Sequence, residues 1–158
     1  MKPEQYFFRY AYPCSENLVM LRKISEKEKK ELEKKFLNNQ CPTKKELEKY
    51  YSAAFERIKK VAKGMKKQPW DIDVIRNYFI KEHNKCIARN EGNYKLLPKS
   101  MKDICKVYIG EVVERKGNIL TLKLNNKNKI IKKVLDNSLN AKKGDKVTVH
   151  YGFAIEKL

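Results

Sequence analysis

Thiol and imidazole groups are the side chains of this chain best suited to binding a transition-metal ion. The sequence contains four cysteines and two histidines: Cys14, Cys41, Cys86, Cys105, His83 and His150. No C-x-x-C pair occurs among them, so neither a zinc ribbon nor a thioredoxin-type redox motif is indicated. We interpret Cys14 and Cys41 as structural residues, because an isolated cysteine usually behaves as a small apolar residue.

His83 and Cys86 are three residues apart in a predicted helix, and positions i and i+3 share one helix face. This spacing is acceptable for two ligands of one metal ion. The alternative is structural, because both residues also belong to the apolar stripe of the same helix.

Cys105 and His150 flank a segment with the alternating pattern of β-strands. Cys105 comes just before the first predicted strand, where a thiolate could hold a soft or low-valent metal. His150 alternates with Val147 and Val149, so its ring should point to the opposite and less buried face, where it could bind a ligand, carry a proton or contact a partner. The structural alternatives are a small apolar residue at a domain boundary and a surface histidine.

Sequence motifs of the common enzyme classes are absent. There is no G-x-x-x-x-G-K-[ST] or G-x-G-x-x-G for phosphates, no G-x-S-x-G and no H-E-x-x-H. Asp71 and Asp73 are better explained as residues that start a helix than as an acid–base pair. We therefore expect a binding protein and not an enzyme.

The formal net charge of this chain of 158 residues is +18, and it is spread along the sequence. Residues 1–100 contain 24 Lys and Arg against 13 Asp and Glu, and residues 101–158 contain 13 against 6. Most of the excess is lysine, which lacks the planar fork with which arginine binds phosphates and bases. A generally lysine-rich surface and a site for a polyanion both fit this pattern.

Hydropathy gives no sign of a membrane segment, since no apolar run of 18 residues occurs. The N-terminus also lacks the charged start, apolar stretch and cleavage site of a secretory signal. These two observations favour a cytoplasmic location with no membrane contact.

Helical signals dominate the first hundred residues. Capping boxes are formed by Ser25 with Glu28 and by Thr43 with Glu46. The second opens the strongest helical pattern of the chain, in which apolar residues recur at three-four spacing over residues 47–62.

Weaker signals indicate where the helical segments begin and end. Gly64 is a plausible stop for the long helix. The aromatic segment 6–12 predicts a short helix that ends at Pro13, and a further helix should start near Asp71. Residues 96–100 look like a linker.

From residue 104 onward the period changes from helical to alternating. Four short strands are predicted, at residues 107–113, 119–124, 130–135 and 147–151, with turns at 116–118, 125–128 and 143–145. Short strands at close, regular spacing are typical of a small barrel. The predicted fold class is therefore α+β, with a helical domain at 1–97 and a small β-barrel of OB-like type at 98–158.

The two ends of the barrel segment resemble the HypC/HupF family of hydrogenase assembly chaperones. Residues 144–158, GDKVTVHYGFAIEKL, are similar to the family's closing segment, in which a Gly-Asp turn, an apolar strand, a His and Gly-Phe-Ala-Ile follow one another. Residues 105–113, CKVYIGEVV, are similar to its opening, a Cys followed after three residues by Pro-Gly and a strand, with Ile109 in place of the Pro. The likeness covers roughly a third of the chain and implies a HypC-like barrel.

The resemblance implies an accessory role in building the iron centre of nickel-iron hydrogenases. The implied partners are the precursor of the hydrogenase large subunit and an iron-handling maturation factor. No firm cofactor is predicted, although a transient iron fragment could be bound. The roles of the family's Cys and His would fall on Cys105 and His150, with Gly110 and Phe153 in the same contact region.

Two other functions remain open from the residues. A basic barrel of the OB type could bind RNA, although aromatic residues for base stacking are few in this part of the chain. The barrel could also be a scaffold that has kept the fold and no longer has a role in metal handling.

Overall fold

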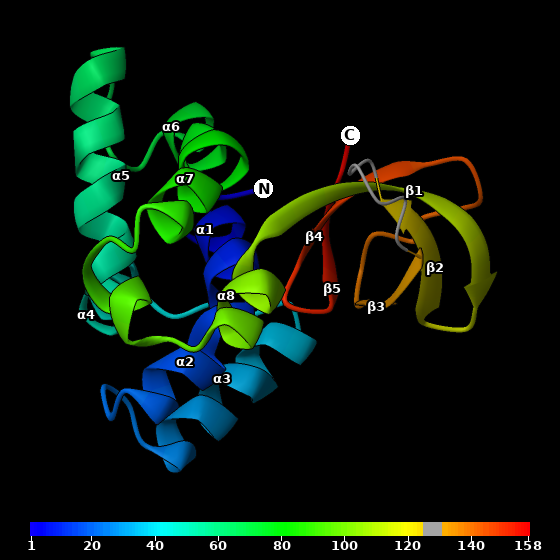
Figure 1. The fold of residues 1–158 in the computed structure, drawn as a ribbon, viewed down its shortest axis with the longest axis horizontal. Coiled ribbons are helices and arrows are strands. Elements are labelled where there is room, and N and C mark those ends of the chain that lie inside the picture. The colour runs from blue at the N-terminus through cyan, green and yellow to red at the C-terminus, as the bar shows by residue number, and fades with distance from the viewer. Residues whose placement is uncertain (125–130) are drawn as a thin grey trace. The chain divides into compact units, whose positions relative to one another are not determined.

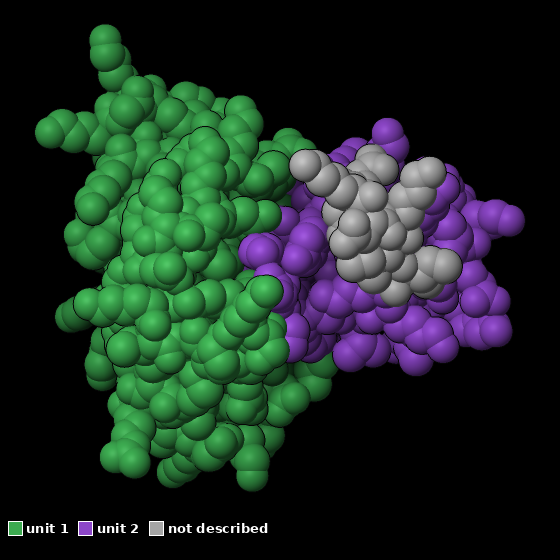
Figure 2. All heavy atoms as spheres, viewed as in Figure 1, with its two compact units in different colours: residues 1–102 green, residues 103–158 purple. Residues whose placement is uncertain are grey.

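The structure is a computed structural model that describes residues 1–124 and 131–158. The chain divides into two compact units, residues 1–102 and residues 103–158, which Figure 2 colours differently. The sequence predicts this boundary five residues earlier, between 97 and 98.

The first unit is helical (Figure 1). Its α-helices are α1 (Pro3–Ala11), α2 (Ser15–Met20), α3 (Glu26–Leu37), α4 (Lys44–Tyr50), α5 (Ser52–Met65), α6 (Ile72–Asn77) and α7 (His83–Ala88). Short turns of 3-10 geometry form η1 (Tyr12–Cys14) and η3 (Gly92–Leu96), and a π-helical turn forms η2 (Tyr78–Glu82). The last helix, α8 (Lys99–Cys105), contains the boundary between the units.

Both predicted capping boxes are confirmed. The Glu28 backbone N–H donates to Ser25 Oγ at 3.2 Å, and the Ser25 backbone N–H donates to Glu28 Oε2 at 2.7 Å. Thr43 and Glu46 exchange the same pair of hydrogen bonds, at 3.3 and 2.7 Å. Each box satisfies backbone N–H groups that the first turn of a helix leaves without a partner.

Three helical predictions need correction. The long helix is two helices, because Tyr51 leaves helical geometry (φ −109°, ψ 36°) between α4 and α5. Gly64 lies inside α5, and Lys66 ends this helix in the left-handed conformation (φ 53°). The segment 96–100 is not an irregular linker, since η3 includes Leu96 and α8 begins at Lys99.

Aromatic rings form the centre of the helical unit. The Phe7 side chain is completely buried, and the Tyr51, Phe55 and Trp70 rings meet its ring edge-on, with centroids 5.6–6.0 Å away. Phe79 of η2 lies 5.9 Å from the same ring. Phe7 therefore joins α1 to α5 and to the segment that leads into α7.

The second unit is a closed five-stranded barrel (Figure 1). Its strands are β1 (Val107–Lys116), β2 (Ile119–Leu124), β3 (Ile131–Asp136), β4 (Lys146–His150) and β5 (Phe153–Lys157), in the order β1-β2-β3-β5-β4. All neighbouring strands are antiparallel except β3 and β5, which are parallel. The α+β fold class with a small C-terminal barrel is confirmed.

The barrel has one strand more than the pattern predicts. The first, second and fourth predicted strands appear as β1, β2 and β4, and β3 begins at Ile131. The additional strand, β5, follows a tight turn in which Tyr151 and Gly152 both have positive φ, at 50° and 91°. Part of the predicted third strand and the hairpin loop at 125–128 lie outside the described residues.

The barrel interior is aliphatic. Its buried residues are Val112, Leu120, Leu122, Leu124, Val134, Ala141, Val147, Val149 and Ala154. Gly110 belongs to this packing, since a Cβ at this position would lie 2.9 Å from Leu124 Cδ2 and 3.3 Å from Leu122 Cβ. The absence of a side chain at Gly110 thus lets β1 and β2 pack closely.

Across the described ranges 1–124 and 131–158, every helix is too short or too polar to cross a lipid bilayer.

Candidate metal-binding residues

Strand pairing in the barrel brings Cys105 next to His150, although 45 residues separate them in the sequence. In the antiparallel pairing of β1 with β4, Val107 is directly opposite His150. Cys105 is two residues before Val107, at the end of α8. The chain thus enters the barrel beside the last residue of β4, which explains why the thiol and the imidazole meet.

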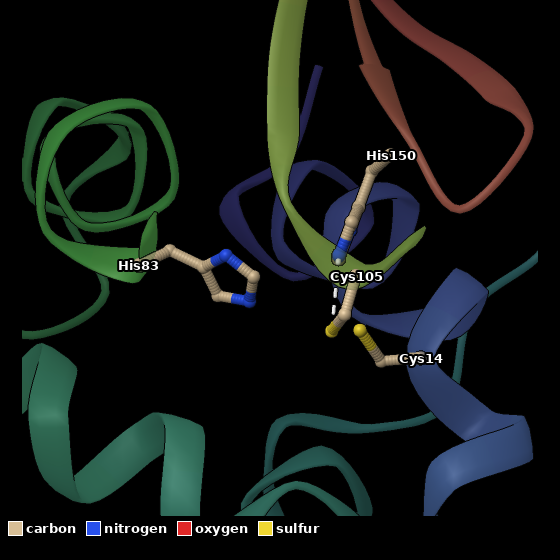
Figure 3. A group of neighbouring side chains, drawn as sticks. All are labelled: Cys14, His83, Cys105 and His150. Atoms are coloured by element: carbon tan, nitrogen blue, oxygen red, sulfur yellow. Dashed lines mark hydrogen bonds between the residues drawn. The ribbon is translucent and has the colours of Figure 1, made fainter. Parts of the chain in front are cut away.

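The Cys105 Sγ atom lies 3.8 Å from His150 Nε2, and the two side chains point toward each other (Figure 3). Both residues are completely buried. A zinc ion takes a thiolate at about 2.3 Å and an imidazole at about 2.1 Å, so two such ligands in a tetrahedral site are about 3.6 Å apart. The pair therefore has the separation that a shared metal ion requires, and without an ion it forms a hydrogen bond between sulfur and nitrogen.

His150 lies on the predicted side of β4 but in a different environment. Val147 and Val149 pack in the barrel core, and strand alternation turns the His150 ring to the other side. The prediction that this side is less buried is wrong, because no part of His150 is exposed. A histidine in such a place must be satisfied by specific polar contacts.

The other two residues predicted for the contact region have different environments. Phe153 is half-buried at the start of β5, opposite His150 on β4 and opposite Leu135 on β3. Gly110 is buried in β1, three residues after Val107. Phe153 is therefore a neighbour of the thiol–imidazole pair, whereas Gly110 shapes the barrel itself.

His83 and Cys86 both lie in α7 and are both buried, as the spacing predicts. Among the described residues, the metal-compatible group of three or more side chains that contains His83 does not include Cys86. The Cys86 thiol lies 4.0 Å from Arg89 Nη2, and burial is the largest of the effects that raise its pKa. The raised pKa keeps the Cys86 thiol protonated at neutral pH, so a metal ion would have to displace this proton in order to bind.

Cys14 is a neighbour of His83 that was not predicted from the sequence. Within the helical unit, the Cys14 thiol and a ring nitrogen of His83 lie within 4.8 Å of each other, and Figure 3 shows both side chains. Cys14 is the last residue of η1 and is half-buried, and His83 is the first residue of α7 and is buried. No local pattern signals this pair, because it depends on how η1 and α7 pack.

The His83 ring is held by aromatic neighbours. The rings of Tyr78, Phe79 and Tyr94 surround it, each with a centroid 5.8 Å from its own. Its Nδ1 atom lies 3.4 Å from Asn84 Oδ1. In the tautomer with the proton on Nδ1, this contact is a hydrogen bond to the amide oxygen, and Nε2 is then the ring nitrogen with the lone pair.

In the described part of each unit, contacts distant in sequence bring a cysteine and a histidine together: Cys14 with His83, and Cys105 with His150. Comparisons of the whole chain with protein-family models, with curated proteins and with solved structures found no match.

Proposed function

We propose that this protein is a non-enzymatic accessory protein of metal-centre assembly, acting in the cytoplasm. It contacts a metal-containing fragment through Cys105 and His150 and docks on the partner that provides or receives that fragment. The observation that carries the proposal is the 3.8 Å separation between Cys105 Sγ and His150 Nε2.

The chemistry of this pair suits a soft or low-valent metal. A thiolate is the preferred protein ligand for such ions, and the adjacent imidazole supplies either a second ligand or a group that accepts the thiol proton. Coordination requires the thiol to lose its proton, so a nearby base assists binding. The barrel thus provides a ligand together with an acceptor for the proton that the ligand must release.

The likeness of residues 105–113 and 144–158 to the HypC/HupF chaperones supports hydrogenase maturation as the specific process. Both segments contribute to the thiol–imidazole pair, since Cys105 lies at the start of the first and His150 lies in the second. The partners under this proposal are the large-subunit precursor and an iron-handling maturation factor. The excess of lysine in residues 101–158 favours a partner with an acidic surface, because complementary charge speeds association.

Affinity capture from the native cell under anaerobic conditions tests this proposal. The wild-type chain is expected to recover a hydrogenase large subunit or a maturation factor, and Cys105→Ser should reduce the recovery at least tenfold, since the thiolate is the principal contact. Cys41→Ser is the matched control, because Cys41 is a half-buried thiol of the helical unit whose pKa burial raises. Recovery of neither protein by the wild type would overturn the hydrogenase role, and equal recovery by Cys105→Ser would overturn the role of the thiol.

The outer face of β2 and β3 favours RNA binding as a second candidate. Barrels of the OB type bind oligonucleotides across their second and third strands. Here Ile119 and Leu135 are opposite each other on this face and are 46% and 45% exposed. Lys123 and Lys133 are exposed on the same two strands. This face therefore presents apolar side chains that bases could contact and lysines that attract phosphates, without an aromatic ring for stacking among these four residues.

Salt dependence of binding to single-stranded RNA checks this candidate. We expect Lys123→Gln with Lys133→Gln to weaken binding about tenfold and to reduce the slope of log K against log salt by about 0.7 for each phosphate that is no longer neutralised by a lysine. Lys59→Gln in α5 is the control and should leave the slope unchanged, because Lys59 pairs with Glu56 at 2.7 Å in the helical unit. Undetectable binding at moderate salt excludes the RNA-binding function.

A further inference from the structure

The helical unit contains a thiol and an imidazole whose function the hydrogenase proposal does not explain. Cys14 and His83 lie in segments that are far apart in the sequence, yet their potential ligand atoms are within 4.8 Å of each other. Neither residue belongs to the segments that resemble the HypC/HupF family. The resemblance to that family therefore does not explain why Cys14 and His83 lie close together.

The surroundings of Cys14 and His83 fit a ligand pair. A zinc ion places a thiolate sulfur and an imidazole nitrogen about 3.6 Å apart, so a separation within 4.8 Å needs only small side-chain rotations. The Asn84 contact at His83 Nδ1 is the kind of second interaction that orients ligating histidines. The ring is also fixed by three aromatic neighbours, which reduces the entropy cost of ordering it when a metal binds.

Packing against aromatic rings explains the buried histidine but not the thiol beside it. Both other cysteines of the helical unit, Cys41 and Cys86, have raised pKa values with burial as the largest cause. Among the described residues, Cys14 is the cysteine of this unit that belongs to a group of three or more metal-compatible side chains that includes His83. Cys14 thus differs from Cys41 and Cys86 in belonging to this group with His83.

We propose that Cys14 and His83 are metal ligands within the helical unit, and that the ion is Zn²⁺ or a similar thiophilic divalent ion. Zinc accepts a thiolate together with an imidazole in tetrahedral sites, whereas hard ions such as Mg²⁺ or Ca²⁺ prefer oxygen ligands. Binding releases the thiol proton, so affinity should increase with pH over the range in which free cysteines ionise.

Titration of the purified, reduced full-length chain with Co²⁺, followed by displacement with Zn²⁺, tests this proposal. Tetrahedral Co²⁺ with thiolate ligands has a sulfur-to-metal charge-transfer band and strong visible d–d bands, so the spectrum reports both geometry and sulfur ligation. The wild type is expected to show these bands and to lose them when Zn²⁺ is added. The titration also counts the ions bound per chain.

Single substitutions identify the ligands. Cys14→Ser and His83→Gln should each weaken Zn²⁺ binding at least tenfold, and Cys14→Ser should also reduce the charge-transfer intensity. Cys41→Ser is the matched control from the same unit and should leave both quantities unchanged. Circular dichroism verifies that each variant is folded. If His83→Gln does not fold, Cys14→Ser decides the question, because Cys14 is half-buried and serine is nearly isosteric.

The results that overturn the proposal differ from those that overturn the hydrogenase role. Wild-type affinity and charge-transfer intensity in folded Cys14→Ser would exclude Cys14 as a ligand, and absence of any Co²⁺ or Zn²⁺ binding would exclude the metal site altogether. Capture of a hydrogenase subunit is independent of both outcomes. A chain that binds zinc through Cys14 and recovers no hydrogenase protein would support this inference and reject the proposed partners.

Discussion

Phe7→Ala is expected to lower the free energy of unfolding of the helical unit by about 4 kcal/mol, since truncation of a buried phenylalanine removes its transfer free energy and leaves a cavity. The Phe7 side chain is completely buried and contacts aromatic rings of α5, of η2 and of the segment before α6. Urea denaturation monitored by Trp70 fluorescence measures the effect directly. Trp70 is the only tryptophan of the chain, and its ring centroid lies 5.6 Å from that of Phe7.

Phe7→Leu is the matched control for cavity formation. Leucine restores most of the missing volume, so its cost should be closer to about 1.5 kcal/mol. A decrease below about 1 kcal/mol for Phe7→Ala would contradict the central place given to this ring. The substitution should also weaken metal binding through His83, because Phe7 contacts Phe79, and the Phe79 ring packs against that of His83.

Local signals in the sequence predicted the features that depend on neighbouring residues. The capping boxes at Ser25 and Thr43 are correct because a capping box involves residues only three positions apart. Strand alternation likewise places the His150 side chain away from Val147 and Val149. In each case the determining interactions lie within a few residues of each other.

The site residues that the sequence misses depend on distant contacts. The i, i+3 spacing suggested Cys86 as the neighbour of His83, but packing of η1 with the helices brings Cys14 within reach of His83. The burial of His150 could not be deduced from its strand, because alternation gives the direction of a side chain and not what covers it. Strand β5 was missed for a different reason. It has only five residues and follows immediately after a turn with positive φ at Tyr151, so the sequence shows no separate strand signal.

The barrel also provides the rigidity on which the Cys105–His150 pair depends. The pair exists because β1 and β4 are held in the register that places Val107 opposite His150. Closure of the sheet removes free edges, so a shift in this register would have to disturb the other strand pairs as well. A buried residue that stabilises the closed barrel therefore also fixes the distance between thiol and imidazole.

Asp136, the last residue of β3, is such a residue. Its carboxylate is completely buried and accepts hydrogen bonds from the backbone N–H groups of Ser138, Leu139 and Ala141 at 2.7–3.2 Å. Arg115 Nη1 donates to the same carboxylate at 2.7 Å and to the Ala141 carbonyl oxygen at 2.9 Å. One side chain thus ties the loop after β3 to the end of β1.

The pKa of Asp136 lies below its ordinary value of about 4. Burial acts in the opposite direction, but the hydrogen bonds from Ala141 and Leu139, and those from Arg115 and Ser138, outweigh it. A carboxyl group with a depressed pKa in the folded state stabilises the fold above its unfolded pKa. That contribution disappears as the pH falls through the folded value.

Asp136→Asn is expected to destabilise the barrel by about 3 kcal/mol at pH 7, because the amide replaces one accepting oxygen with a donor and leaves Arg115 without its anionic partner. Hydrogen exchange of amides in β1–β5 measures the barrel separately from the helical unit. Glu114→Gln, an exposed substitution in β1, is the control and should change the stability by less than about 0.5 kcal/mol. The difference between wild type and Asp136→Asn should shrink as the pH falls through the pKa of Asp136, and a difference that stays constant down to about pH 2 would show that its charge does not stabilise the barrel.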